Sequence, residues 1–154
     1  MTTAIAPQLA TGHIGLNVSD LDRSMDFYRR AFGFEQLVAS ADGDEKRWAF
    51  LGANGKLVLT LWQQSDGAFS TKTPGLHHLS FQVDTIEQVR SIEALLRELS
   101  VSFAYDGVVA HGESVASGGV FFVDPDGIRL EIYAPTGAES APAPSGAAPT
   151  CGFF

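Results

Sequence analysis

The chain has 154 residues, which is enough for one ordinary globular domain or for two small half-domains that share a core, and excludes two large domains. Its 45% hydrophobic content is typical of a packed protein and argues against disorder throughout. A formal net charge of -8 argues against nucleic acid or an anionic membrane as the partner, because both require a basic surface.

The sequence contains neither a membrane-spanning run nor a secretory signal, so the cytoplasm is the expected location. No run approaches the ~18 consecutive apolar residues that cross a bilayer, and residues 1–10 lack the basic start and apolar stretch of a secretory signal. The single cysteine, Cys151, allows no internal disulfide.

The first half of the chain predicts one strand, one helix and three further strands. Residues 13–18 read His-Ile-Gly-Leu-Asn-Val, which alternates as a half-buried strand does. A helix follows, with Asp20 as its N-cap and Gly33 as its stop. Strand-like runs then cover residues 35–39, 47–51 and 56–62, with an Asn-Gly hairpin turn between the last two.

The second half repeats this order. Residues 78–83 read His-Leu-Ser-Phe-Gln-Val, and Thr85 with Gln88 forms a predicted capping box at the start of the next helix. Strand-like runs follow at residues 102–105, 119–123 and 128–133, and Asp-Gly marks the last turn. The sequence therefore predicts an α+β fold of two βαβββ modules.

The composition also sets the expected module boundaries. The modules span about residues 10–64 and 75–135, joined by a polar stretch. Residues 136–154 form an Ala- and Pro-rich tail that cannot bury enough apolar surface to fold alone. Its last four residues are apolar again, and they either dock on the body or a partner, or fray.

Three potential metal ligands are expected on the helix-free faces of the two modules. In each alternating strand the apolar residues must face the helix, which leaves His13 and His78 on the opposite face. Glu131 alternates with apolar neighbours in the same way. Two imidazoles and one carboxylate suit a divalent Fe, Mn, Ni, Co or Zn ion, and sequence alone does not choose among them.

These residues belong to longer motifs. Residues 13–21 read His-Ile-Gly-Leu-Asn-Val-Ser-Asp-Leu, residues 75–84 read Gly-Leu-His-His-Leu-Ser-Phe-Gln-Val-Asp, and residues 122–131 read Phe-Val-Asp-Pro-Asp-Gly-Ile-Arg-Leu-Glu. Together they resemble the vicinal oxygen chelate superfamily, which comprises glyoxalase I, bleomycin-resistance proteins, fosfomycin-resistance enzymes and extradiol dioxygenases. The resemblance spans residues 11–134 and implies an open, cup-like barrel with the helices outside.

The resemblance places metal ligands on the first and last strands of each module. It implies His13, His78 and Glu131 as ligands, whereas the matching position in the first module is Leu59, counted four residues after Gly55 as Glu131 is after Gly127. Leucine cannot bind a metal, so a three-ligand site is expected. The resemblance also implies a homodimer, whose modules pair within one chain or by exchange between two chains.

Three ligands with open positions point away from glyoxalase I. The absence of Lys and Arg between Arg97 and Arg129 also argues against a phosphonate substrate of the fosfomycin type. Aromatic residues that can line the cavity favour a neutral or aromatic small molecule. These residues are Trp48, Phe50, Trp62 and Tyr105, with His111 beside them.

The leading hypothesis is therefore a metal-dependent enzyme, of the dioxygenase or of the lyase and isomerase type, whose substrate chelates the ion through two adjacent oxygens. His111 and Tyr105 are candidate proton-transfer groups, although the Gly- and Ser-rich loop around His111 favours a solvated loop histidine over that role. The alternatives are a binding protein of the bleomycin-resistance type, which sequesters an antibiotic or a metabolite, and a regulatory protein that keeps the fold.

Overall fold

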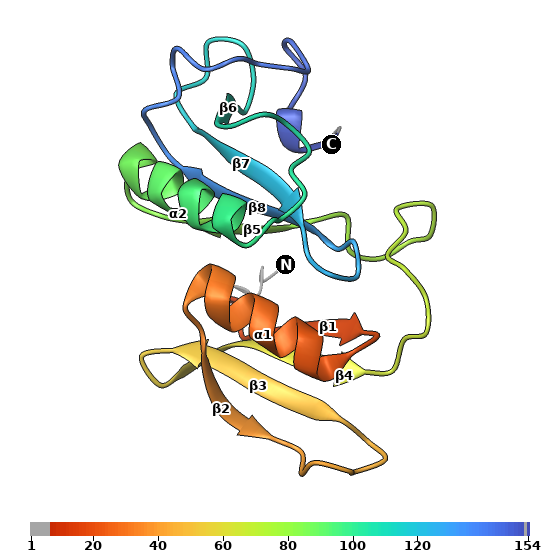
Figure 1. Cartoon of the computed structure of the whole chain (residues 1–154). Helices are drawn as coiled ribbons and strands as arrows, with labels where there is room; N and C mark the ends of the chain where they lie inside the picture. Colours follow the sequence, from red (N-terminus) through yellow and green to blue (C-terminus); the bar gives the residue numbers. More distant parts are fainter. Residues whose placement is uncertain (1–6, 153) are drawn as a thin grey trace, which may run out of the picture. The chain divides into compact units, whose positions relative to one another are not determined.

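A computed structural model describes residues 7–152 and 154. The chain forms two compact units, of which the first ends at Ser65 and the second begins at Asp66. Each unit has the order βαβββ (Figure 1), so the predicted α+β class and the repeated module are confirmed. Residues 1–6, in the stretch where no secretory signal is expected, lie outside the described residues.

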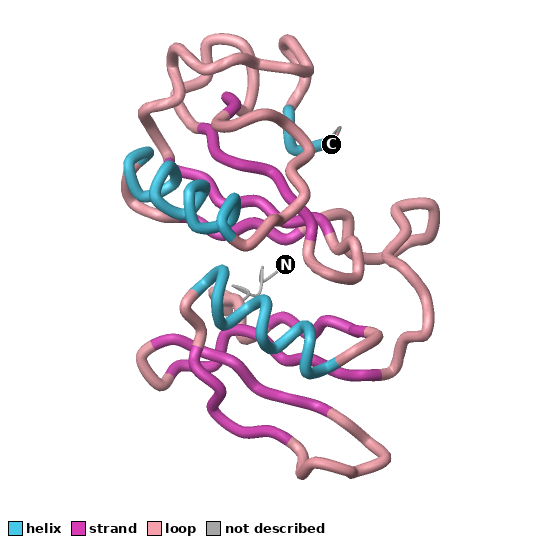
Figure 2. Tube along the Cα trace, in the orientation of Figure 1, coloured by secondary structure: helices cyan, strands magenta, loops and turns pink. Residues whose placement is uncertain are grey.

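The first unit is a four-stranded mixed sheet with one helix on one of its faces (Figure 2). β1 and β4 run parallel, and the other neighbours are antiparallel, in the order β1-β4-β3-β2. The elements are β1 Ile14–Val18, α1 Leu21–Phe32, β2 Glu35–Ala39, β3 Trp48–Ala53 and β4 Lys56–Gln63.

The second unit repeats this topology in the order β5-β8-β7-β6, with β5 and β8 parallel. A short 3-10 helix, η1, follows the last strand. The elements are β5 Leu79–Gln82, α2 Ile86–Glu98, β6 Val109–Ala110, β7 Gly118–Val123, β8 Arg129–Ala134 and η1 Thr150–Gly152.

Both helices begin where the sequence predicts, and the first also ends there. The Asp20 carboxylate accepts a hydrogen bond from the backbone N–H of Arg23 (3.0 Å), and Gly33 ends α1 in the left-handed conformation that favours glycine. At α2, Thr85 and Gln88 form the predicted capping box.

Each helix covers the apolar face of its sheet. α1 contacts β3 and β4, and α2 contacts β7 and β8. The side chains on these covered faces are fully buried, and each large one contributes roughly 1.5–3 kcal/mol to stability. They include Val18, Leu51, Leu59 and Leu61 in the first unit and Val120, Phe122, Leu130 and Ile132 in the second.

One predicted strand is wrong. Residues 102–105 form only an isolated bridge between Phe103 and Phe122, although Ala104 donates a backbone hydrogen bond to Phe121 (2.8 Å). The edge strand of the second unit is instead the two-residue β6, which contains Val109 and Ala110. Such a short edge gives no alternation from which a sequence pattern could be recognised.

The segment after β8 folds back onto the second unit. We call residues 136–152 with Phe154 the C-terminal segment. Backbone hydrogen bonds hold it to β6 and to the loop that follows β6. These bonds join Ala138 to Ala116 (2.9 Å), Ala110 to Pro142 (2.7 Å), Glu113 to Gly146 (3.0 Å) and Thr150 to His111 (2.9 Å).

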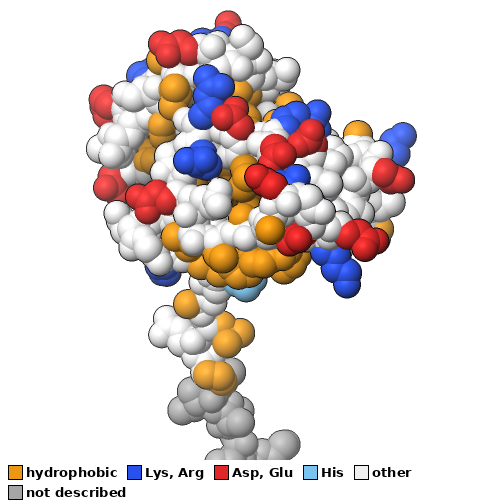
Figure 3. All heavy atoms as spheres, turned by 60° about the horizontal axis from the view of Figure 1, so that its bottom comes forward, with side chains coloured by type: hydrophobic (Ala, Val, Ile, Leu, Met, Phe, Trp, Pro, Cys, Tyr) orange, Lys and Arg blue, Asp and Glu red, His pale blue; other side chains and the backbone are white. Residues whose placement is uncertain are grey.

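Within the described residues, no helix is long and apolar enough to cross a membrane. The face shown in Figure 3 carries acidic and basic side chains intermingled with hydrophobic ones. This face therefore lacks a continuous basic area of the kind that phosphate backbones require.

Candidate metal centre

On the helix-free face of the second unit, side chains of β5, β7 and β8 lie side by side. Ser80 of β5 is paired with Glu131 of β8, and Phe121 of β7 is paired with the same glutamate. Paired residues on neighbouring strands point to the same face, so Glu131 lies between a polar and an aromatic neighbour. The glutamate is 2% exposed, which makes it one of the few buried charged residues of the unit.

Two histidines contact the Glu131 carboxylate. Nε2 of His78 lies 3.4 Å from one carboxylate oxygen, and Nε2 of His111 contacts the other. A buried carboxylate requires such partners, because an isolated charge in a low-dielectric environment costs several kcal/mol. The two imidazoles thus account for both oxygens of the glutamate.

Ser117 contacts the ring of His111 at the nitrogen opposite the one that contacts Glu131, and thereby orients the ring. The hydroxyl of Ser117 lies 2.7 Å from Nδ1 of His111. An ionised carboxylate only accepts hydrogen bonds, so Nε2 of His111 donates to Glu131, while the hydroxyl of Ser117 can either donate to Nδ1 or accept from it. His111 is half-buried against Glu131, so it is not the solvated loop residue that the sequence favoured.

His78 has its own neighbour on the other side of the ring. Its Nδ1 lies 2.8 Å from Nδ1 of the exposed His77. Burial lowers the pKa of His78, and this effect outweighs the opposing charge of Glu131. The neutral imidazole, which is the form that binds metals, is therefore favoured, and Nδ1 of His77 can accept a hydrogen bond from the Nδ1–H of His78 when Nε2 binds a metal.

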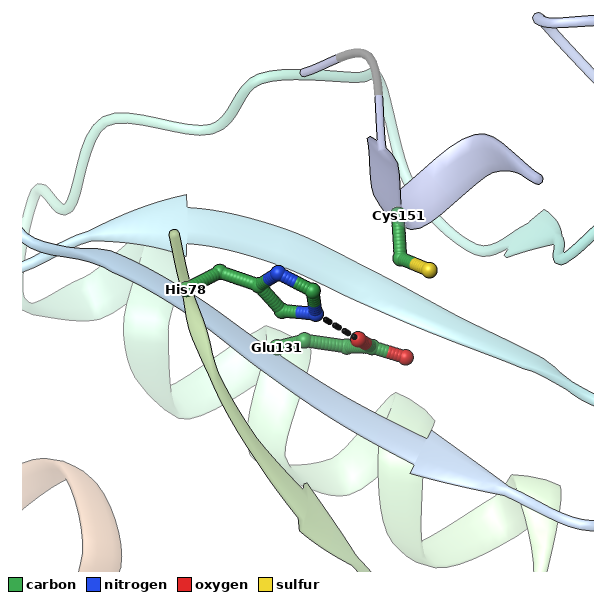
Figure 4. A group of neighbouring side chains, drawn as sticks. All are labelled: His78, Glu131 and Cys151. Atoms are coloured by element: carbon green, nitrogen blue, oxygen red, sulfur yellow. Dashed lines mark ion pairs between the residues drawn. The ribbon is translucent and has the colours of Figure 1, made fainter. Parts of the chain in front are cut away.

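A third donor comes from the C-terminal segment. Figure 4 shows Cys151 of η1 directed toward His78 and Glu131, and one donor atom of each residue lies within 4.8 Å of the other two. Burial raises the pKa of the Cys151 thiol, and the negative charge of Glu131 adds to this effect. Both effects favour the protonated thiol when no metal ion is bound.

Aromatic rings surround this cluster. Phe154 packs its ring against Phe121 (4.8 Å between centroids) and against His78 (5.6 Å), while Arg129 lies over the same ring (5.3 Å). Tyr105 contacts Phe121 edge to face (5.7 Å). The cluster is thus bordered by apolar rings and by one cation, Arg129, on the same face as Glu131.

His13 belongs to the first unit, where it is exposed and directly precedes β1. His78 precedes β5 in the same way, so the two histidines occupy equivalent positions in the duplicated fold. The exposed imidazole of His13 is available to a ligand.

The position equivalent to Glu131 in the first unit is Thr60, which corrects the prediction of Leu59. Gly15 is paired with Thr60 as Ser80 is paired with Glu131. A β-bulge between Leu51 and Gly52 of β3 inserts one residue into β4, so counting from the turn misses by one position. Leu59 points into the core, and the Thr60 hydroxyl accepts a hydrogen bond from Trp62 (2.9 Å).

The helix-free face of the first unit is aromatic. Trp48, Phe50 and Trp62 form a cluster with ring centroids 5.1–6.3 Å apart. The two tryptophans also line an open pocket of ≈ 530 Å³, together with residues 45–47 and 63–64. This face provides an aromatic surface, and Thr60 is its only side-chain hydroxyl among the paired residues of β1, β3 and β4.

Sequence reasoning identified part of this centre. The structure brings together His78, Glu131 and His111, which were all predicted, and places Tyr105 at the edge of their aromatic border. Cys151 was not predicted as a ligand, because no pattern in the Ala- and Pro-rich segment indicates that it returns to β8. Its single occurrence beside a terminal apolar stretch was the one available signal.

The family of the chain follows from comparison with known proteins. Residues 10–132 match the Glyoxalase/Bleomycin resistance protein/Dioxygenase superfamily. The chain belongs to this superfamily. The resemblance to vicinal oxygen chelate proteins in the sequence motifs is thereby confirmed.

One relative is similar in sequence over most of this chain. A catechol-2,3-dioxygenase from Bacillus subtilis (strain 168) is 28% identical over 135 residues, which cover 86% of this chain but only 44% of the dioxygenase. The chain therefore spans less than half the length of that relative.

Solved structures share the fold over most of the chain. A glyoxylase/bleomycin resistance protein/dioxygenase domain from Frankia sp. EAN1pec is 26% identical, with a TM-score of 0.71 over 84% of this chain and 93% of that one. A fosfomycin resistance protein from Listeria monocytogenes, complexed with Mn(II) and a dihydroxypropylphosphonic acid, is 22% identical, with a TM-score of 0.63 over 82% and 93%. At that identity the likeness shows the fold alone.

Proposed function

We propose that this protein is a metal-dependent enzyme in which His13, His78 and Glu131 hold one divalent ion. The observation that carries the proposal is the buried Glu131 carboxylate, which faces the imidazole of His78 across 3.4 Å. Nitrogen and carboxylate oxygen donors suit Fe, Mn, Co, Ni or Zn. The equivalent position of His13 in the duplicated fold supports its role as the third ligand.

The substrate we propose is a small, neutral or aromatic molecule with two adjacent oxygen atoms. Three protein ligands leave positions for both oxygens, and the rings of Phe121 and Tyr105 border the site with apolar surface. A bound ion supplies Lewis-acid stabilisation of negative charge on the substrate oxygens, and reaction with O2 if it is iron. The similarity to a catechol-2,3-dioxygenase supports a substrate of the catechol type.

We assign proton transfer to His111, whose ring is oriented by the hydroxyl of Ser117 at Nδ1. Its Nε2 contacts Glu131, within reach of a group bound next to that carboxylate. Tyr105 is a second candidate, because its ring lies edge to face against Phe121 at the border of the site.

The test combines metal analysis with turnover. Purified protein is expected to bind one transition-metal ion per chain by mass spectrometry and to consume O2 with catechols after loading with Fe(II). His78→Ala and Glu131→Gln should each lose most of the metal, whereas Glu139→Gln, which removes an exposed carboxylate of the same unit, should retain it. Wild-type protein without stoichiometric metal, together with unchanged metal content in His78→Ala, would contradict the proposal.

A homodimer is also part of the proposal, and variant mixing tests how the units pair. If the modules exchange between two copies, co-refolded His13→Ala and His78→Ala chains regain one complete ligand set per mixed dimer. Partial recovery of metal content on mixing therefore indicates exchange, and no recovery indicates pairing within a chain.

Sequestration of an aromatic compound is the second candidate function. The observation that favours it is the cluster of Trp48, Phe50 and Trp62, which offers a stacking surface without metal. Titration of the metal-free protein with aromatic compounds, followed by Trp fluorescence, separates the two functions. Tight binding that Glu131→Gln leaves unchanged, without turnover by the metal-loaded protein, supports sequestration.

A further inference from the structure

The C-terminal segment brings a sulfur donor to the proposed metal site. The donor atoms of Cys151, His78 and Glu131 all lie within 4.8 Å of one another (Figure 4). Ligand atoms around a tetrahedral ion are separated by about 3.3–3.8 Å, given metal–ligand bonds of about 2.0–2.3 Å. Small rotations of the three side chains are therefore enough to place them around one ion.

The chain is anchored on both sides of Cys151, by hydrogen bonds of Thr150 and by ring contacts of Phe154. Thr150 donates its hydroxyl to the backbone oxygen of Ala110 (2.6 Å) and its N–H to the backbone oxygen of His111 (2.9 Å). Beyond Cys151, Phe154 packs between Phe121 and Arg129. The backbone that carries the thiol is thus anchored to the residue whose imidazole contacts Glu131.

We propose that Cys151 is a protein ligand of the metal ion, in addition to His78 and Glu131; this rests on the metal site proposed above. On binding, the thiol releases its proton to solvent and the thiolate forms a metal–sulfur bond. The first unit offers Thr60 instead of a carboxylate at its equivalent position. Cys151 therefore supplies the protein ligand that the first unit lacks.

Two consequences follow from the chemistry of sulfur. A thiolate favours Zn and Co over Mn, which prefers oxygen donors. The sulfur also takes up one coordination position, so His13, His78, Glu131 and Cys151 together leave two positions of a six-coordinate ion for the two oxygens of a chelating substrate.

Absorption spectroscopy of the Co(II)-loaded full-length chain tests the proposal. Cobalt bound to a thiolate has an intense sulfur-to-metal charge-transfer band in the near ultraviolet, which nitrogen and oxygen ligands do not produce. Cys151 is the single cysteine, so such a band has one source in the chain. We expect the band in the wild-type protein and its complete loss in Cys151→Ser, with one cobalt still bound.

The affinity of the protein for different metal ions gives a second test of the role of Cys151. Cys151→Ser should weaken Zn(II) and Co(II) binding about tenfold or more and change Mn(II) binding much less. The matched control is the double variant Cys151→Ser/Ser140→Cys, which moves the thiol to an exposed position of the same segment. This variant should show no band.

The outcomes separate this inference from the proposed function. Cobalt that binds to the wild-type protein and is lost in Glu131→Gln, but shows no charge-transfer band, overturns the role of Cys151 and leaves the metal site intact. A band of equal strength in the Ser140→Cys double variant also overturns it, because the thiol would then be recruited without specificity. If cobalt does not bind, or binds equally to Glu131→Gln, both proposals fail.

Discussion

Nε2 of His78 lies 3.4 Å from the carboxylate of Glu131, although the two residues are 53 positions apart in the chain. Parallel pairing of β5 with β8 produces this approach, because it places Ser80 beside Glu131 and leaves His78 at the end of the same face. The metal site we propose thus depends on one strand pair rather than on a loop.

Substitution of Glu131 by Gln is expected to reduce metal affinity most strongly. The amide keeps the size of the side chain but removes the charge that both histidines face, so the loss should exceed the roughly 10–100-fold effect of changing a residue that only supports a ligand. Competitive titration with a chelating dye measures the affinity. An affinity within twofold of wild type would show that Glu131 is not a ligand.

Substitution of Ser117 by Ala tests whether the Ser117 hydroxyl orients the ring of His111. Loss of the hydroxyl leaves Nδ1 of His111 without its 2.7 Å partner and frees the ring to change tautomer. Turnover should fall by about 10-fold or more while the folded structure is retained. Ser117→Thr, which keeps a hydroxyl, is the control and should recover most of the activity.

The sequence predicted the fold well because the relevant signals are local. Alternation in β1 and β5, the Asp20 cap and the Thr85 capping box each lie within a few residues. In the first unit, counting residues from the hairpin turn predicted the wrong position, Leu59 instead of Thr60. The bulge at Gly52 shifts the register by one, and this shift follows from backbone pairing that residue types alone do not indicate.

The candidate site was predicted less completely, again for a physical reason. His78 and Glu131 lie on strands with a clear apolar face, so their orientation follows from alternation. Cys151 lies in a segment held by backbone hydrogen bonds, such as the one from Thr150 to His111, and such bonds have no residue signature.

Gly52 is expected to be essential for the bulge. A Cβ at this position would lie 2.1 Å from the backbone oxygen of Lys56, so the strands would have to separate. Gly52→Ala should therefore lower the free energy of unfolding by more than about 2 kcal/mol. Gly12→Ala is the control, because a Cβ there meets nothing within 4 Å, and its effect should stay within about 0.5 kcal/mol. Urea denaturation measures both.

Thr60 is expected to matter for stability but not for metal binding. Thr60→Val keeps the shape but removes the acceptor of the Trp62 indole hydrogen bond, at a cost of about 1 kcal/mol. Thr60→Ser retains the acceptor and serves as the control. Loss of metal from Thr60→Val, at a concentration where the variant is folded, would instead make Thr60 a ligand and contradict our assignment of the first unit.

The ion pair between Asp22 and Arg47 should make stability depend on pH. The two groups make contacts of 2.9 and 3.4 Å, and the hydrogen bond from Arg47 lowers the pKa of Asp22. A carboxyl group with a lowered pKa in the folded state contributes stability above its unfolded pKa of about 3.9 and loses it as the pH falls through the folded value. The Asp22 side chain is 68% exposed, although that of Arg47 is only 18% exposed, so the effect should be small and screened by salt.

The measurement is the difference between the urea midpoints of wild type and Asp22→Asn. The wild type should be the more stable at pH 7, and the difference should close below pH ~4, because the protonated carboxyl then resembles the amide. Asp66→Asn, which removes another exposed carboxylate, controls for the change in net charge. A difference that persists undiminished at pH ~2.5 would mean that Asp22 acts through packing and not through its charge.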